Sequence, residues 1–201
     1  MAENAKETAI AHTGSIKSAP FGAAFLYGYN TAKPTGTVDH GLANSDGVSI
    51  TKSNNTTVIM AWQDDEEVRE TSTEAYIDYT FGLLQFVNDD NMELAFGVTK
   101  NATTGGWHWD ASKRGDWKQF FIEAIDKENN FQILYWLPKG RVQEIADITV
   151  NSQGIMTLTL TIRARKIEVE GQDANTVIFK GLWRDEDEAD GSATTLSNAG
   201  N

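Results

Sequence analysis

Two stretches of the chain alternate strictly between apolar and polar residues, and this alternation restricts the fold more than any other feature. Residues 74–83 place an apolar side chain at every second position from Ala75 to Leu83. Residues 155–167 do the same, with Leu158, Leu160 and Ile162 on one face and threonines and Arg163 on the other. A period of two is typical of β-strands with one buried face. Both stretches are therefore predicted to be half-buried strands.

Further strands are expected wherever β-branched and aromatic residues run between turn signals. They are residues 21–29, 48–51, 56–63, 117–126, 131–137, 141–150 and 176–180. The sequence KENN between the two runs at 117–137 predicts a hairpin, and NSDG at 44–47 predicts a turn.

A single internal helix is predicted to begin after Asn88 and to end at Gly97. Asn88 supplies a side-chain acceptor at the N-cap, and Asp89 and Asp90 suit the positive end of a helix. With about seven to nine strands and no regular strand-helix repetition, the predicted class is mainly β, all-β or α+β, with antiparallel sheets.

Three regions are expected along the chain. Residues 1–36 form an N-terminal arm with a short strand, and residues 37–181 form the β domain. Residues 182–201 are acidic and then rich in Gly, Ser and Ala, which predicts a flexible tail.

The charge balance excludes several functions. The 201 residues contain 17 Lys and Arg against 29 Asp and Glu, a net charge of -12, so a protein that grips nucleic acid is not expected. The absence of cysteine excludes disulfides and thiolate metal sites. No apolar run is long enough to span a bilayer, and the first residues lack the pattern of a signal peptide, so we expect no membrane association and synthesis in a cytoplasm.

No enzymatic motif is present in the sequence. Neither G-x-S-x-G, a Walker loop nor G-x-G-x-x-G occurs, and the three histidines are far apart. The carboxylates at 64–67 and 185–188 are adjacent in loops, where they are more typical of solvated charge than of acid-base catalysis. We therefore expect no catalytic residue, metal site or cofactor.

The aromatic sequence Trp107-His108-Trp109 lies in the loop predicted at 98–116. One interpretation is a platform on which a sugar stacks, as in a β-sandwich that binds carbohydrate or a host surface. The other is a loop that packs its rings on the core or on a neighbouring subunit. The second is the more common use of such residues.

Six short motifs follow one another between Asp39 and Gly97. They are Gly41-Leu42, Ser45-Asp46-Gly47-Val48, Ala61-Trp62-Gln63, Val68-Arg69, a polar strand, and Leu94-Ala95-Phe96-Gly97. In this order they resemble the central block of the major tail proteins, or tail tube proteins, of long-tailed, non-contractile bacteriophages, particularly those that infect actinobacteria. The resemblance covers about a third of the chain.

The resemblance implies two packed antiparallel sheets, as a sandwich or partial barrel, flanked by one helix. It also implies that six copies close into a ring and that rings stack into a tube through which DNA passes without specific binding. The implied partners are further copies of the chain, the tape measure protein and the tail-end or terminator proteins. The implied location is the virion tail, after synthesis in the cytoplasm of the host bacterium. A related tail terminator ring is the alternative within this class.

Four residues of the resembling block are candidates for a motif that maintains fold and assembly. Trp62, Gln63 and Arg69 are expected to fix the loop between two strands, and Gly97 ends the helix. Trp62 fits equally well as an ordinary core tryptophan.

Two further candidates lie on the polar face of residues 74–83. Glu74 and Asp78 are expected to line the lumen, where negative charge offers no anchor to DNA phosphates. A solvated outer face is the alternative for both. Trp107, His108 and Trp109 are the candidate inter-subunit loop.

Overall fold

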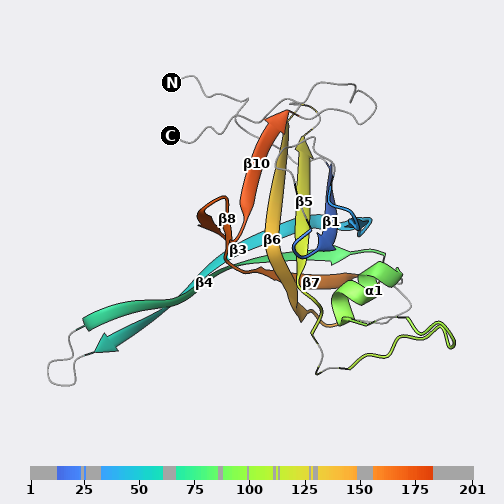
Figure 1. Cartoon of the computed structure of the whole chain (residues 1–201), viewed down its shortest axis with the longest axis horizontal. Helices are drawn as coiled ribbons and strands as arrows, with labels where there is room; N and C mark the ends of the chain where they lie inside the picture. The colour runs from blue at the N-terminus through green and yellow to red at the C-terminus, as the bar shows by residue number, and fades with distance from the viewer. Residues whose placement is uncertain are drawn as a thin grey trace.

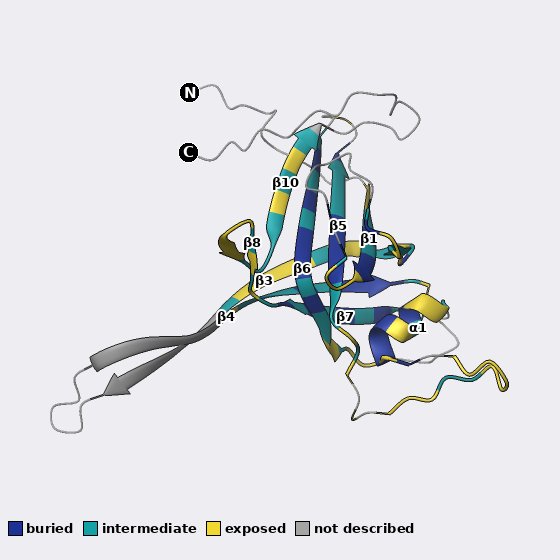
Figure 2. Ribbon diagram, viewed as in Figure 1, coloured by how far each residue is buried: buried dark blue, intermediate teal, exposed yellow. Residues whose placement is uncertain are grey.

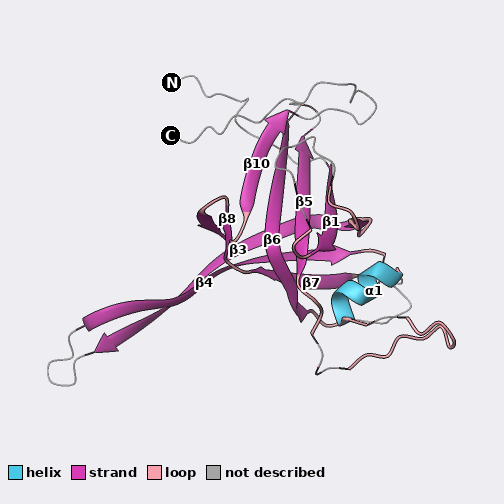
Figure 3. Ribbon diagram, viewed as in Figure 1, coloured by secondary structure: helices cyan, strands magenta, loops and turns pink. Residues whose placement is uncertain are grey.

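A computed structural model shows the fold. It describes residues 13–23, 25, 33–60, 67–85, 88–98, 100–110, 112, 114–126, 128, 131–148 and 156–182. For residues 54–60, 67–74 and 182 it describes the backbone and not the side chains. Ten strands and one helix occur in this part of the chain (Figures 1 and 3). In chain order they are β1 Thr13–Pro20, β2 Val38–Asp39, β3 Ala43–Met60, β4 Glu67–Leu83, α1 Asp89–Phe96, β5 Lys118–Asp126, β6 Phe131–Ile145, β7 Leu158–Ala164, β8 Ile167–Val169, β9 Gln172–Ala174 and β10 Val177–Leu182.

The main sheet has eight antiparallel strands in the order β2-β1-β5-β6-β7-β4-β3, with β10 as an additional partner of β6. Strand β6 changes partners along its length: Phe131–Trp136 pair with β10, whereas Gly140–Ile145 pair with β7. The strands β1, β5, β6 and β10 therefore form one layer, and β3, β4 and β7 cross it as a second layer (Figure 1). The sheet is not closed into a barrel, and β8 and β9 form a small second sheet.

The main core lies between the two layers (Figure 2). Phe120 and Ile122 of β5 meet Phe81 of β4 and Leu160 of β7, and helix α1 covers the end of this core with Leu94, Ala95 and Phe96. A second apolar cluster covers the opposite side of the first layer, where Phe25 packs on Phe121, Trp136 and Phe179. The first layer is thus buried on both faces.

The predicted class is confirmed: the protein is mainly β, antiparallel, with one helix. Tyr79, Phe81 and Leu83 are buried on one face of β4, and Leu158, Leu160 and Ile162 are fully buried on one face of β7, as their alternation predicts. The hairpin predicted around KENN is also confirmed, as β5 and β6.

Two predicted interruptions lie within continuous strands. The NSDG sequence at 44–47 is not a separate turn but a bulge in β3, because Ala43 pairs with Leu83 and Val48 with Phe81, and Gly47 has a left-handed φ of 70°. Likewise, residues 131–137 and 141–145 are one strand, β6. A register shift opposite Lys118–Phe120 accommodates the Pro-Lys-Gly sequence at 138–140, which lies between the two predicted strands.

The strand predicted at 21–29 is wrong in its described part. Phe21 and Gly22 form a turn, and the strand of the N-terminal region is β1, which lies earlier in the chain. Residues 13–20 lack a sustained apolar period, yet they pair with β5 over their whole length. Backbone pairing with an already buried strand thus outweighs local pattern here. The division of the chain at residues 36 and 181 stays a prediction.

Helix α1 has the predicted ends. The side chain of Asn88 accepts a hydrogen bond from the backbone N–H of Asp90 at 2.9 Å. Gly97 adopts a left-handed conformation with φ 63°, and its N–H donates to Glu93 O, which satisfies a carbonyl of the last turn. Gly97 therefore ends the helix at the predicted position.

Gly140 lies where β6 leaves β5 and joins β7, and we expect Gly140→Ala to destabilise the fold. A Cβ at this position would lie 2.8 Å from the ring of Phe120 and 3.1 Å from Ile162, both of which are buried. The expected loss is about 1–3 kcal/mol in chemical denaturation. Gly106→Ala is the matched control, because its Cβ would meet only Thr104 at 3.8 Å and should change stability by less than about 0.5 kcal/mol.

A buried polar network joins β1, the segment after β2 and helix α1. Asn91 Nδ2 donates to the carbonyls of His40 and Gln85, which leaves its Oδ1 to accept from His40 Nδ1 at 2.7 Å. Burial favours the neutral imidazole, in which His40 Nε2 accepts from the hydroxyl of Ser18 at 2.8 Å. The ring is almost completely buried.

Stability is expected to decrease on mild acidification because of His40. Burial lowers its pKa below the usual 6.5, with Lys118 adding to the decrease and Asn91, Asp90 and Asp39 opposing it. The unfolded chain then binds this proton more readily, so the free energy of unfolding is highest above pH 6.5 and falls as the pH decreases toward the folded pKa. Denaturation between pH 7.5 and 5.5 should show a slope of up to about 1.4 kcal/mol per pH unit.

Two variants separate His40 from other titrating groups. His40→Gln should flatten the profile, whereas His108→Gln, at an exposed position, should leave the slope unchanged. Equal slopes in the wild type and in His40→Gln would contradict this explanation.

Candidate assembly surfaces

The main sheet ends in open strand edges on both sides. On one side β3 pairs only with β4. On the other, β1 pairs with β2 only at Lys17 and Ser18, and the carbonyl of Ile16 accepts from the N–H of His40, so that Thr13–Ser15 present an edge without a partner in the described part of the chain. Unpaired N–H and C=O groups on a strand edge are ready to pair with another chain. The two edges differ in sequence and lie at opposite ends of one sheet.

The second feature is a two-stranded ribbon, made of residues 54–60 of β3 and 67–75 of β4. Its strands pair with each other, from Asn54 with Ala75 to Met60 with Glu67, whereas β7 pairs with β4 only from Ile77 onward. The ribbon consequently projects away from both layers of the fold (Figure 1). At about 3.3 Å per residue it extends roughly 25 Å beyond the sheet.

The candidate loop motif lies within the described ribbon only at Arg69. Trp62 and Gln63 lie outside the described residues. Arg69 and Glu74 are described only by their backbones, which pair with Ile59 and Asn55 in the ribbon. The roles of these four residues stay predictions.

Asp78 lies on the polar face of β4, as its position in the alternation predicts. Its two carboxylate oxygens accept hydrogen bonds from Arg163 Nε and Nη2 of β7, both at 2.8 Å. The guanidinium also lies over the ring of Tyr76, 3.7 Å from its centroid, and Thr80 bonds Thr161 beside it at 3.0 Å. Asp78 is therefore half-buried and its charge is neutralised, so this part of the face is not simply acidic. Whether it lines a lumen stays a prediction.

The aromatic loop places its two indoles in different surroundings. Trp107 pairs by its backbone with Lys100, whose ammonium lies 5.0 Å from the indole centroid, and it packs partly on the core. Trp109 packs on Phe96 of α1 at 4.7 Å between centroids but is 64% exposed. His108 is exposed. The three residues thus form a loop that is held on the core and presents one tryptophan to the outside.

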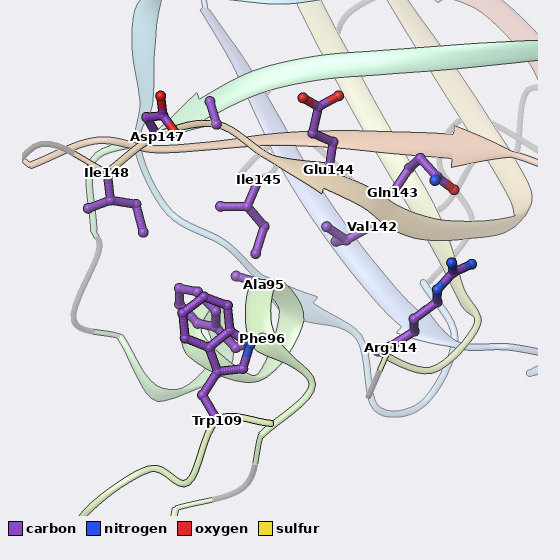
Figure 4. Close-up of a pocket in the computed structure, with 12 residues that line it drawn as sticks. Ala95, Phe96, Trp109, Arg114, Val142, Gln143, Glu144, Ile145, Asp147 and Ile148 are labelled. Atoms are coloured by element: carbon purple, nitrogen blue, oxygen red, sulfur yellow. The ribbon is translucent and has the colours of Figure 1, made fainter. Parts of the chain in front are cut away.

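A groove of about 530 Å³ lies between this loop, the end of α1 and the end of β6 (Figure 4). Phe96, Trp109, Ile145 and Ile148 provide apolar walls, and Arg114 stands at one end. Strand β5 pairs with β6 only as far as Gly140. Beyond Gly140, β6 still pairs with β7 along one edge, but its other edge borders the groove and has no strand partner in the described residues. An open edge beside an exposed tryptophan is typical of a surface that another protein chain covers.

Other kinds of site find no support in the part of the chain that the structure describes. No group of three or more His, Asp or Glu residues there is placed to hold a metal ion. The helix described is also too short and too polar to cross a membrane.

Sequence patterns did not identify the partner of Asp78. The alternation places Arg163 on the polar face of its strand, but the contact depends on β4 and β7 being neighbours although 85 residues separate Asp78 from Arg163. No local signal contains that information.

Comparison with known proteins identifies the family. The model of the family described as phage tail tube protein matches residues 1–189. The chain belongs to the phage tail tube protein family. The suspected resemblance is thereby confirmed at family level, and the narrower resemblance to actinobacteriophage proteins stays a prediction. A member of this family is a structural component of the virion tail.

No curated protein matches the chain. Among solved structures, the chain is similar to one in the cryo-EM structure of the anti-feeding prophage (AFP) baseplate, 6-fold symmetrised, with 12% sequence identity, a TM-score of 0.41, and 86% of this chain and 95% of that chain covered.

Proposed function

We propose that this tail tube family member is a non-enzymatic subunit that closes into hexameric rings, which stack into the tube of the phage tail. The family match over residues 1–189 is the observation that supports this function best. The number of six copies and the stacking follow from the resemblance to tail tube proteins. The tape measure protein and the tail-end or terminator proteins are the other partners proposed.

The two open edges of the main sheet fit such a ring. A closed ring of identical copies needs two different surfaces that complement each other, and the β1 and β3 edges are different surfaces at opposite ends of one sheet. Pairing between copies would also cover edges that otherwise promote aggregation. The loop with Trp107, His108 and Trp109, together with the adjoining groove, is a second contact surface in this proposal.

The acidic balance fits a conduit for DNA. A net charge of -12 on each copy gives phosphates little to bind, so DNA can pass through the lumen without being held. Glu74 remains a candidate for the lumen wall. Asp78 would contribute less negative potential there, because Arg163 neutralises it.

Native mass spectrometry and negative-stain microscopy of the purified, concentrated chain test this function. We expect rings of about 133 kDa, six times the 22.2 kDa of one chain, and hollow tubes built from them. A protein that stays monomeric at high concentration and gives a signal on a glycan array would contradict the proposal and favour the carbohydrate-binding alternative.

A further inference from the structure

The second layer of the fold is a four-stranded sheet in the order β6-β7-β4-β3, to which β6 contributes its last residues, Gly140–Ile145. Both outer strands of this layer have an open edge in the described part of the chain. On one side β3 pairs only with β4, and on the other β6 has no partner beyond Gly140 except β7. The layer can therefore accept a further strand at each end.

The β3 end exposes an apolar side chain on the face of the sheet that carries the main core. Ile50 pairs with Tyr79, and Val48 pairs with Phe81, so all four side chains lie on this face. Tyr79 and Phe81 are almost completely buried, whereas Ile50, on the edge strand, is 44% exposed. The core face of the sheet thus ends in an uncovered isoleucine.

The opposite end of the same face carries a groove. Val142 and Ile145 of β6 pair with core residues of β7 and lie beside the groove of about 530 Å³ that Phe96 and Trp109 also line (Figure 4). Trp109 is 64% exposed, so the groove is open to a neighbouring molecule. An apolar side chain therefore protrudes at one end of the face, and an apolar groove lies open at the other.

The directions of the strands allow the two ends to meet. Each neighbouring pair in the layer is antiparallel, so β6 and β3, which are three strands apart, run in opposite directions. When one copy follows another in the same orientation, β3 of one lies antiparallel to β6 of the other. The polar face stays continuous as well, because Ser49, Thr80, Thr161 and Glu144 form one cross-strand row. Such a contact joins two different surfaces, as a closed ring requires.

The charges at the two ends also favour the contact. Residues 47–63, which include the free edge of β3, contain Lys52 and none of the 29 carboxylates of the chain. The groove side carries the exposed carboxylates of Glu144 and Asp147 against a single cation, Arg114. Copies that each have a net charge of -12 repel one another, so a strand without carboxylates is the better one to place beside these acidic side chains.

The β6 end is a better counterpart for β3 than the β1 edge. The open part of β1, Thr13–Ser15, has three residues, against five in Arg141–Ile145. The groove beside Trp109 borders the β6 edge and is lined by no residue of β1. Pairing at β6 therefore covers both a longer edge and the exposed isoleucine.

We propose that the free edge of β3, residues 48–53, pairs with Arg141–Ile145 of a second copy of this chain and inserts Ile50 into the groove beside Trp109. The contact rests on the proposed assembly into rings and specifies the interface between neighbouring copies in one ring. Strand addition supplies backbone hydrogen bonds, and the isoleucine in its groove fixes the register. Trp109 is covered in the assembled state.

Paired cysteine substitutions test the contact, because the chain has no cysteine of its own. Glu144→Cys is combined in turn with Ser49→Cys, Thr51→Cys and Ser53→Cys, which lie on one face of β3 and sample different registers. Within one copy Ser49 and Glu144 are three strands apart, roughly 14 Å, whereas a disulfide needs Cα atoms within about 7 Å. A disulfide between these positions can therefore form only between copies.

Mild oxidation of the assembled protein should give a covalent ladder that ends at six chains in denaturing electrophoresis, for at least one of the three double variants. Glu144→Cys alone should give no product larger than a dimer. The absence of a ladder from all three double variants would overturn the proposal. A stronger ladder from Ser49→Cys combined with Thr13→Cys would also overturn it, because β3 would then pair with the β1 edge.

Isoleucine substitutions provide the second test. Ile50→Thr keeps a β-branched side chain on the strand but removes apolar contact, so it should raise the concentration needed for assembly about tenfold. Ile178→Thr is the matched control, because Ile178 is 61% exposed on β10 and its replacement should leave assembly unchanged. Thermal midpoints of both monomers within a few degrees of the wild type show that folding is intact. Equal assembly of the two variants would contradict the insertion of Ile50.

The outcomes for this contact and for the proposed function can be distinguished. Tubes in the microscope without a ladder from any of the three double variants would retain the function and reject the contact. A ladder that continues past six chains, without rings or tubes, would retain the contact and reject the function. A protein that stays monomeric under all conditions would reject both.

Discussion

Replacing Asn91 with leucine should destabilise the monomer by about 3–5 kcal/mol, which is a large fraction of the stability of a domain of this size. Asn91 is fully buried and makes three hydrogen bonds, to His40 Nδ1 and to the carbonyls of His40 and Gln85. Leucine has a similar volume but leaves one donor and two acceptors without partners. Each unsatisfied buried group costs about 1–3 kcal/mol. Chemical denaturation under conditions that prevent assembly measures the loss.

Asn88 offers a matched control on the same helix. Asn88 is half-buried and its capping hydrogen bond is exposed, so Asn88→Ala should cost only about 1 kcal/mol. Both variants remove an asparagine side chain, so the difference in their stability losses reports the effect of burying the amide. An Asn91→Leu variant as stable as Asn88→Ala would show that the network does not hold α1 to β1.

The sequence predicts those parts of the fold in which local pattern and burial agree. The alternation in residues 74–83 and 155–167 corresponds to β4 and β7, because both strands have one face on the main core. The Asn88 and Gly97 caps define α1 because capping depends on neighbouring residues only. Strand β1 was missed, since its place in the sheet comes from pairing with residues of β5 that lie 98 to 112 positions away, and not from its own period.

The residues of the candidate surfaces also fall into those that a local pattern predicts and those that depend on distant pairing. Asp78 and the aromatic loop were identified from residue type and position. The cluster of Lys139 and Arg141 around Trp117 was not, because it forms where the strands predicted at 131–137 and 141–150 are one strand. Their proximity to Trp117 and Arg114 results from the hairpin of β5 and β6, whose register contains a shift at this point. A grouping of charged residues that depends on such a register shift cannot be predicted from the linear sequence.

Deleting most of the projecting ribbon should abolish assembly while leaving the fold intact. The proposed variant lacks residues 55–74 and joins Asn54 to Ala75 through an Asn-Gly turn, which suits a two-residue hairpin. The ribbon pairs with no other strand in the described part of the chain, and β4 first pairs with β7 at Ile77. The monomer should therefore keep its circular dichroism spectrum, and its thermal midpoint should change by only a few degrees.

Assembly should respond differently, because a ribbon that extends roughly 25 Å from the sheet cannot contribute to the core and is available to neighbouring copies. We expect the deleted variant to form no tubes at concentrations at least tenfold above those at which the full chain forms them. Glu168→Gln, at an exposed position of the small sheet formed by β8 and β9, is the control that should assemble normally. Tubes of normal yield from the deleted variant would show that the ribbon is not an assembly element, and the contacts between copies would then have to lie on the strand edges and the groove beside Trp109.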